Sequence, residues 1–551
     1  MTPVSTADLV IANGRIVDGC GNPWYYGDVA VRGGRIAAIG AAGALRGGAV
    51  VDAGGRYVTP GFVDPHTHSD ISILQYPRAD SVVRQGVTTH VTGNCGMSAA
   101  PLGAAHRDEA LHNWAHYWDI SGVAWDWASF RQYLKALELA GGAINIAPLV
   151  GHGALRLAVV GLAERAVTER ELVSMERLLD AALRAGAHGL STGLVYPPGC
   201  FSDTEELVRL CRVVARHRGI YTTHVRGERE TILEAVAEAI AIGRRAGVPV
   251  QVSHNVPKWG APEGAAANLA LIEAARREGL DATTDSDVHT DLAPRLSRAL
   301  PQPVLDLDHD ALIALLSDRS RRAELRRAVV EDVLPGAGYA GLIRHGRFER
   351  LVIFQAGRHP ELRGRSVADI AAERAADPFD TFLDLIVEED DQIVGLFDYM
   401  EEKNIRALLC SPLSMVSSDG LVMPPADELD DAALYWPCSY GEYPGILERY
   451  VRDEPVLRLE EAIRKMTSFP AQRFGLLDRG VLRPGLRADL VVFDLDKVRD
   501  RATNLYPHTY PFENIPHRHP EGLDWVLVNG EPVIAEGEHT GALPGRVLRR
   551  R

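Results

Sequence analysis

Between about residue 60 and residue 480, short apolar runs alternate with longer amphipathic stretches. The apolar runs include GVTTHVTG, INIAPLVGH, AHGLSTGLV, GIYTTHV and PVQVSH. The longer stretches, such as ERELVSMERLLDAALRAGA, carry apolar residues at helical spacing, with a glycine after the last turn. A strand followed by a helix, repeated many times, favours a parallel sheet covered by helices. We therefore expect an α/β chain whose main domain, residues 59–481, is a (β/α)8 TIM-like barrel.

The two ends of the chain have a different sequence pattern from the middle. DLVIANGRIVDG and AVVDAGGRYVTPG near the start, and GVLRPGLRADLVVFDLD and WVLVNGEPVIAEG near the end, alternate apolar and polar residues between Gly-rich turns. This pattern predicts a small β-sandwich domain built from both termini, residues 1–58 plus 482–551. Two unrelated β extensions are the alternative.

Residues 291–374 are too long for a loop and contain their own helical runs, such as HDALIALLSDRSRRAELRRAVVEDVL. Long excursions of this kind within a compact domain are usually functional lids or separate subdomains. We expect an inserted lid subdomain over the mouth of the barrel.

Composition excludes several functions. With 59 Lys plus Arg against 74 Asp plus Glu, the net charge of −15 argues against a nucleic-acid partner, which needs clustered positive charge.

No run approaches the ~20 apolar residues of a membrane-spanning helix, and the first residues lack the pattern of a signal peptide. Six cysteines in 551 residues form no disulfide framework, which favours a reducing, cytoplasmic setting. The sequence is silent on oligomeric state.

The segment Pro60–Asp70, PGFVDPHTHSD, carries the sharpest chemical signal. In an extended segment alternate side chains share a face, so His66 and His68 point the same way and can grip one metal ion. Further polar residues also close apolar runs before Gly, Asn or a loop, which is where a β/α barrel builds its active site. They are Cys95, His224, His254 and Asp419.

Four imidazoles, one thiolate and one carboxylate suit a borderline-soft divalent metal such as zinc better than magnesium or calcium. A thiolate next to a cation is deprotonated and need not be redox-active. A lone cysteine is more often a small buried hydrophobe, and we interpret the other five in that way, as packing or pocket-wall residues: Cys20, Cys200, Cys211, Cys410 and Cys438.

Together these segments resemble the amidohydrolase superfamily, and within it the N-acyl-D-amino-acid deacylases (D-aminoacylases). The resemblance covers nearly the whole chain. It rests on PGFVDPHTH, GNCG, VGHGALR, STGLVYPPG, THVRGE, VSHN and SSDG, and on the C-terminal EEAIRKMTSFPAQRFGL and DRGVLRPGLRADLVVFD. GNCG together with STGLVYPPG is the part most specific to the deacylases.

The resemblance implies a set of metal ligands. Many amidohydrolases bridge two metals with a carboxylated lysine on the fourth strand, and GLSTGLVYPPG has no lysine. The family pattern instead gives the bridging role to the Cys95 thiolate. One tightly held zinc would be bound by Cys95, His224 and His254, and a second, weaker site would use His66, His68 and Asp419.

Hydrolysis of an amide then requires a nucleophile stronger than water at neutral pH. Zinc lowers the pKa of a bound water from ~15.7 to about 7 and polarises the carbonyl that this water attacks. The leaving amine must be protonated, and Asp419 is our candidate for the group that carries the proton from the water to the nitrogen. Without the family context, Ser-Asp-Gly would be ordinary turn chemistry.

The pocket departs from the family pattern. D-aminoacylases hold the substrate's α-carboxylate with an arginine, and in YWPCSYGEYPG (residues 435–445) Cys438 takes that place. The segment TTDSDVHTDLAPRL brings Asp287 and His289 near the mouth, whereas Tyr196 is kept. Arg226 and Lys258 remain as possible cations. Losing a guanidinium and gaining aspartates disfavours an anion, so we expect an amine portion that is neutral or cationic here, or a masked carboxylate.

The sequence thus predicts a zinc-dependent enzyme that cleaves a linear N-acyl amide, with a small molecule as substrate. The alternative enzyme is a cyclic-amide hydrolase of the hydantoinase or dihydroorotase type, which the cysteine and the missing lysine disfavour. A non-catalytic scaffold that kept the fold and lost its metals predicts eroded ligands, whereas all six candidates are present. The acyl group, the amine and the stereochemical preference are not readable from the sequence.

Overall fold

The computed structural model describes residues 7–550, except 116–117, 119, 290, 293–294, 301–303, 305–306, 332–339, 424–436 and 503–518. Tyr435 and Trp436, the start of the altered YWPCSYGEYPG segment, lie outside the described residues. Within the described ranges, no helix combines the length and the apolar character that crossing a membrane requires.

A closed ring of parallel strands forms the centre of the described structure. β6 (Phe62–Asp64), β7 (Val87–Thr92) and β8 (Asn145–Pro148) pair in that order. A second run pairs β9 (Val150–Gly151), β10 (Gly189–Gly193), β11 (Ile220–His224), β12 (Val250–Val252), β13 (Ala282–Ser286) and β17 (Ser414–Val416). β8 and β9 follow each other across Leu149, and a parallel bridge from Thr67 to Gly420 joins the two ends. The predicted barrel is confirmed.

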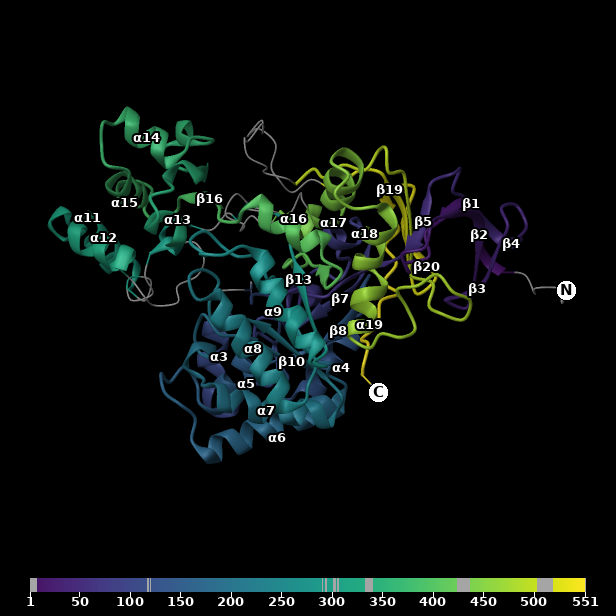
Figure 1. The fold of residues 1–551 in the computed structure, drawn as a ribbon, viewed down its shortest axis with the longest axis horizontal. Helices are drawn as coiled ribbons and strands as arrows, with labels where there is room; N and C mark the ends of the chain where they lie inside the picture. The colour runs from purple at the N-terminus through teal and green to yellow at the C-terminus, as the bar shows by residue number, and fades with distance from the viewer. Residues whose placement is uncertain are drawn as a thin grey trace.

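Amphipathic helices cover the outside of the ring (Figure 1). α6 (Glu169–Ala185), α7 (Thr204–Arg216), α8 (Ile232–Ala246) and α9 (Ala265–Arg277) each follow a strand. α6 shows why these sequences form helices: Thr168 and Glu171 make a reciprocal capping box, and Gly186 ends the helix in a left-handed conformation. Its buried side chains, Leu172, Met175 and Leu179 among them, face the strands.

Strands from both ends of the chain share one nine-stranded sheet. Its N-terminal members are β1 (Ala7–Ile16), β2 (Tyr25–Arg32), β3 (Arg35–Gly40), β4 (Gly47–Asp52) and β5 (Tyr57–Pro60). Its C-terminal members are β18 (Leu490–Phe493), β19 (Leu523–Val528), β20 (Glu531–Ala535) and β21 (Glu538–His539). β18 pairs antiparallel with β5 and thereby joins the two halves. A separate apolar core, which includes Ile11, Val29 and Leu527, stabilises this sheet.

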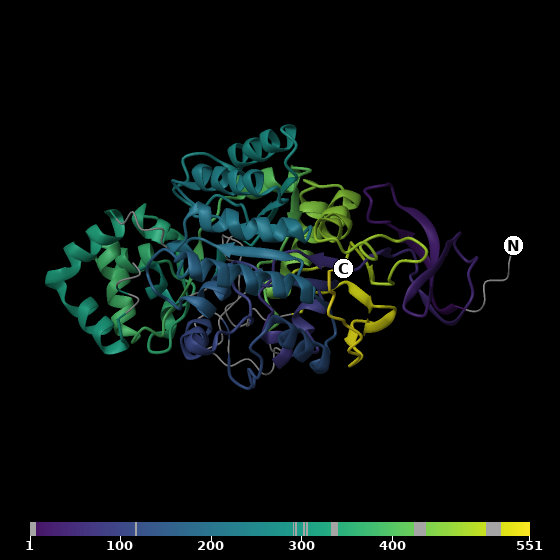
Figure 2. The ribbon, with the colours of Figure 1, turned by 90° about the horizontal axis from the view of Figure 1, so that it is seen from below.

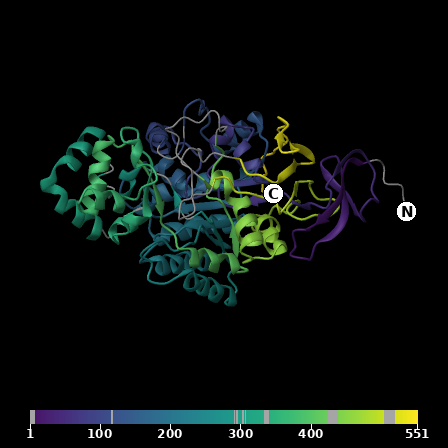
Figure 3. The same ribbon diagram turned by 90° about the horizontal axis from the view of Figure 1, so that it is seen from above.

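The excursion between β13 and β17 contains a three-stranded antiparallel sheet and helices of its own. The strands are β14 (Asp291–Leu292), β15 (Leu351–Gln355) and β16 (Val394–Asp398), and the main helices are α11 (His309–Ser317), α12 (Arg322–Glu331), α14 (Val367–Glu373) and α15 (Pro378–Glu388). Because β14 pairs with β16, we propose that the insert extends past residue 374 to Asp398. It lies at one end of the molecule and β1–β4 at the other (Figure 2, Figure 3).

A buried ion cluster ties α7 to α5 (His152–Val159), the helix that begins where β9 ends. Oε1 of Glu206 lies 2.7 Å from Nε2 of His152, and Oε2 of Glu206 lies 2.7 Å from Nη1 of Arg156. All three side chains are buried. A charge buried without its partner is costly, whereas an exposed pair contributes little.

Glu206→Ala is therefore expected to lower the free energy of unfolding by about 3–5 kcal/mol, because it leaves the Arg156 guanidinium buried without a counter-charge. Glu278→Ala, which removes the exposed partner of Arg244, is expected to cost about 1 kcal/mol or less. Urea unfolding followed by circular dichroism measures both values. Equal losses in the two variants would contradict a structural role for the buried cluster.

Candidate metal centre

The six predicted metal ligands meet at one end of the barrel. His66 and His68 follow β6, Cys95 follows β7, and His224 is the last residue of β11. His254 follows β12 and Asp419 follows β17. These positions are the carboxyl ends of five strands of the ring, so residues up to 353 positions apart in sequence (His66 to Asp419) share one centre.

Three of these residues have a backbone conformation that side chains normally avoid. Cys95, His254 and Asp419 have φ values of 48°, 28° and 53°, in the left-handed region that costs of order 1–3 kcal/mol for a residue with a side chain. Hydrogen bonds hold the strained turns: the His254 amide donates to Asp285 at 2.8 Å, and the Asp419 amide donates to the His66 carbonyl at 3.1 Å. Half of the six candidate ligands adopt this conformation, which indicates a functional demand on the direction of their side chains.

The Cys95 sulfur lies at the middle of three imidazoles. Its Sγ is 3.1 Å from Nε2 of His66, 3.4 Å from Nε2 of His254 and 3.6 Å from Nδ1 of His224. Ligand atoms around a tetrahedral zinc ion are about 3.3–3.8 Å apart, given Zn–N and Zn–S bonds of about 2.0 and 2.3 Å. The distances to His254 and His224 fall within this range, and the distance to His66 is slightly shorter.

Asp419 reaches the same centre from the carboxyl end of β17. Its Oδ1 is 3.0 Å from Nε2 of His68 and 3.4 Å from Nε2 of His66. Ligand atoms of His66, Cys95, His254 and Asp419 all lie within 4.8 Å of one another, so they could hold a metal ion.

The imidazoles and the carboxylate have the charge states that metal ligands need, whereas the thiol does not. Burial lowers the pKa of His66 to about 3 and that of His254 well below its usual value, so both imidazoles stay neutral. Burial opposes ionisation of Asp419, but the hydrogen bond from His68 lowers its pKa well below the usual range. Burial and the Asp419 charge raise the pKa of the Cys95 thiol well above its usual value. A stable thiolate here therefore requires a cation.

Two carboxylates that the sequence analysis did not single out lie near the imidazoles. Asp285 Oδ1 lies 3.6 Å from Nδ1 of His66, and Glu228 Oε1 lies 3.5 Å from Nε2 of His224. Neither imidazole nitrogen makes a hydrogen bond within the described residues. The ligand atoms of His224, Glu228 and His254 lie within 4.8 Å of one another and form a second group that could hold a metal ion. In the sequence, Glu228 could have been noticed because it stands four residues after His224. Asp285 could have been noticed only as an acidic residue within a strand.

Two other predicted site residues lie beside the centre. The Tyr196 hydroxyl donates to the Cys95 carbonyl at 3.4 Å, and its ring lies 5.5 Å from that of His224. Lys258 is buried, with its ammonium 4.0 Å from Glu228 and 4.6 Å above the centre of the Tyr399 ring.

Arg226 is held elsewhere. Its guanidinium donates to both carboxylate oxygens of Glu238, at 2.9 and 3.2 Å, and to the Cys200 carbonyl at 3.3 Å. The predicted contact between Arg226 and a substrate finds no support in this arrangement.

The two segments that depart from the family pattern follow β13 and form α17 (Cys438–Gly445). Nδ1 of His289 lies 2.5 Å from Oε2 of Glu442, and its Nε2 lies 3.4 Å from Oδ2 of Asp500. The three side chains are buried. Although burial alone would lower it, these two carboxylates raise the pKa of His289 well above its usual value, so the imidazole is a buried cation. The triad fixes α17, and with it the buried Cys438, against the end of β13. Asp287 is buried beside them.

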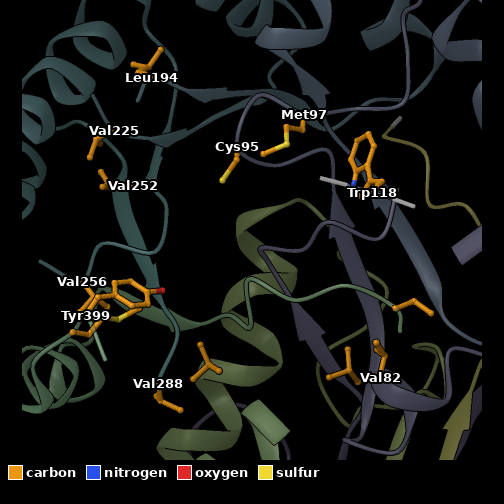
Figure 4. Packing of buried hydrophobic residues seen from close by; sticks show 14 of the residues in the cluster. Val82, Cys95, Met97, Trp118, Leu194, Val225, Val252, Val256, Val288 and Tyr399 are labelled. Carbon is orange, nitrogen blue, oxygen red and sulfur yellow. The ribbon is translucent and has the colours of Figure 1, made fainter. Parts of the chain in front are cut away.

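A small hollow next to Cys95 has room for about one water molecule. Its walls are largely apolar or glycine and include Met97, Trp114, Tyr196, Pro197 and Pro198. Figure 4 shows Cys95 on its loop with Met97 beside it and Trp118 beyond.

Known proteins share this architecture. The sequence matches the amidohydrolase family over residues 49–534. It is 36% identical, over 98% of both chains, to a D-aminoacylase of Alcaligenes xylosoxydans xylosoxydans. A solved D-aminoacylase with a binuclear metal centre is 34% identical with a TM-score of 0.76, covering 99% of this chain and all of the other. An N-acyl-D-glutamate deacylase from Bordetella bronchiseptica, solved with zinc and a phosphonate mimic of the tetrahedral intermediate, is 33% identical with a TM-score of 0.75 over the same shares.

Replacing Cys95 tests the centre directly. Cys95→Ala is expected to lose most of the tightly bound metal, because the sulfur lies 3.1–3.6 Å from three imidazole nitrogens. Cys211→Ala is the matched control, since Cys211 is an equally buried free thiol inside α7, and it is expected to keep the wild-type metal content. Inductively coupled plasma mass spectrometry after dialysis measures both. Wild-type metal content in Cys95→Ala would contradict the assignment.

Proposed function

Because the chain belongs to the amidohydrolase family, we propose that it is a zinc-dependent hydrolase of linear N-acyl amides, related to the D-aminoacylases but with a changed pocket for the amine portion. The observation that carries this proposal is the convergence of the Cys95 thiol, neutral imidazoles and the Asp419 carboxylate at one end of the barrel. The relatives named for deacylation of N-acyl-D-amino acids support a linear amide as substrate.

The donor set fits zinc. Cys95, His224 and His254 would hold one ion, and His66, His68 and Asp419 a second, weaker one. Thiolate and imidazole donors at this spacing suit a borderline-soft metal and no hard cation. When bound, zinc supplies a Lewis acid that polarises a carbonyl and lowers the pKa of a water molecule.

Asp419 is the residue that we propose for proton transfer. The hydrogen bond from His68 keeps its carboxylate ionised, so it can accept a proton from the attacking water. It then returns that proton to the nitrogen of the departing amine, which leaves as a neutral molecule. The strained turn at Asp419 and its hydrogen bond to the His66 carbonyl hold the carboxylate toward the ligands.

We propose that the acyl portion lies against Tyr196, beside Cys95 and His224. Lys258, Asp287, His289 and Cys438 form the opposite wall. A thiol in place of a guanidinium cannot make the bidentate contact that a carboxylate prefers. The amine portion is therefore neutral or cationic at this wall, or carries a masked carboxylate.

Asp419→Asn is expected to keep its metal content and to lose about 10²–10⁴-fold in kcat, because the amide cannot carry the proton. Asp180→Asn, on the outer helix α6 and about as exposed as Asp419, is the control and should keep wild-type kcat. Turnover of N-hexanoyl amides by the zinc-loaded variants, with metal analysis of the same samples, provides the measurement. Near-normal turnover in metal-loaded Asp419→Asn would remove Asp419 from the mechanism.

A further inference from the structure

Asp287 lies at the mouth of the barrel, one residue after β13 ends. Alternate residues of a strand share a face, and two positions earlier Asp285 points into the ring toward His66. Asp287 therefore continues the inward face one step closer to the mouth. Its side chain is 5% exposed.

This carboxyl has a buried oxygen without a partner. Among the described residues, nothing donates a hydrogen bond to Oδ1 of Asp287. A buried polar oxygen left in that state costs about 1–3 kcal/mol, and more when it is charged. Burial raises the pKa of Asp287 to about 7; Lys258 opposes this rise, and Glu442 and Asp419 add to it.

The other charges at this wall already have partners. Glu442 is paired with His289 at 2.5 Å. The Lys258 ammonium lies against Glu228 and the Tyr399 ring. Asp419 faces His66 and His68. Within the described part of the chain, Asp287 has no ion pair at 4.0 Å or closer, so the wall retains one unmatched acidic group.

Tyr196 and Asp287 lie on different sides of the centre. Tyr196 follows β10, whereas Asp287 follows β13, three strands further round the ring. An amide held at the centre with its acyl portion against Tyr196 thus directs its amine portion toward Asp287.

Building on the proposed function, we infer that Asp287 is the binding site for a positively charged nitrogen on the amine portion of the substrate, so that the preferred substrates are N-acyl derivatives of diamines or of basic amino acids. A protonated amine supplies both the hydrogen-bond donor and the opposite charge that Asp287 lacks. A carboxylate in the same position would face Asp287 and Glu442 as like charges.

The test compares two isosteric amides, N-(4-aminobutyl)hexanamide and N-pentylhexanamide, which differ by an ammonium in place of a methyl group. The zinc-loaded wild-type enzyme is expected to show a kcat/KM about 30-fold or more higher for the aminobutyl compound, because only its ammonium can make a buried charge-assisted contact with Asp287. Asp287→Asn, which keeps the size of the side chain, is expected to reduce this preference to about threefold or less.

Asp281→Asn is the control. It removes one negative charge from the residue just before the other end of the same strand, where Asp281 is exposed and paired with Arg473, and it should keep the wild-type preference. Unchanged preference in Asp287→Asn, or equal rates for the two amides in the wild type, would overturn the inference and leave the proposed function standing.

If the zinc-loaded enzyme cleaves neither amide nor any other N-acyl amide, the proposed function fails instead. Calorimetric titration with 1,4-diaminobutane then judges the inference separately. About tenfold or more weaker binding to Asp287→Asn than to the wild type supports the site, and equal binding overturns it.

Discussion

The arrangement of one thiol among three imidazoles is the contact on which the rest of the structure depends. The Cys95 sulfur lies 3.1–3.6 Å from nitrogens of His66, His254 and His224, in surroundings that raise the pKa of the thiol and lower that of the imidazoles. A bound cation would stabilise this convergence of a thiol and three imidazoles. The barrel makes the convergence possible, because the carboxyl ends of parallel strands bring distant segments of the chain to one place.

Backbone strain and buried carboxylates maintain this arrangement. Left-handed turns at Cys95, His254 and Asp419 aim the ligands, and Asp285 accepts a hydrogen bond from the His254 amide. Glycine is required where the chain passes closest: a side chain at Gly193 would collide with the Cys95 carbonyl. On the other wall, the triad of His289, Glu442 and Asp500 fixes α17 against the end of β13. The stability lost at the centre is offset by the large apolar core around the barrel.

The sequence predicted the barrel and the six candidate ligands because both depend on local pattern: a strand, then a polar residue, then a turn. It did not single out Asp285 or Glu228, since their importance lies in which imidazole nitrogen they face. Arg226 illustrates the same limit. The sequence offers it as a possible cation at the site, and only the structure shows that Glu238, twelve residues further along in α8, pairs with its guanidinium. The insert shows a similar limit, because the pairing of β14 with β16 joins residues about a hundred positions apart.

The central claim is that Cys95 is a metal ligand, and X-ray absorption at the zinc edge of the wild-type protein tests it most directly. With one zinc ion bound per chain, the account predicts one sulfur neighbour at about 2.3 Å together with nitrogen neighbours at about 2.0 Å. A spectrum with only nitrogen and oxygen neighbours would contradict it.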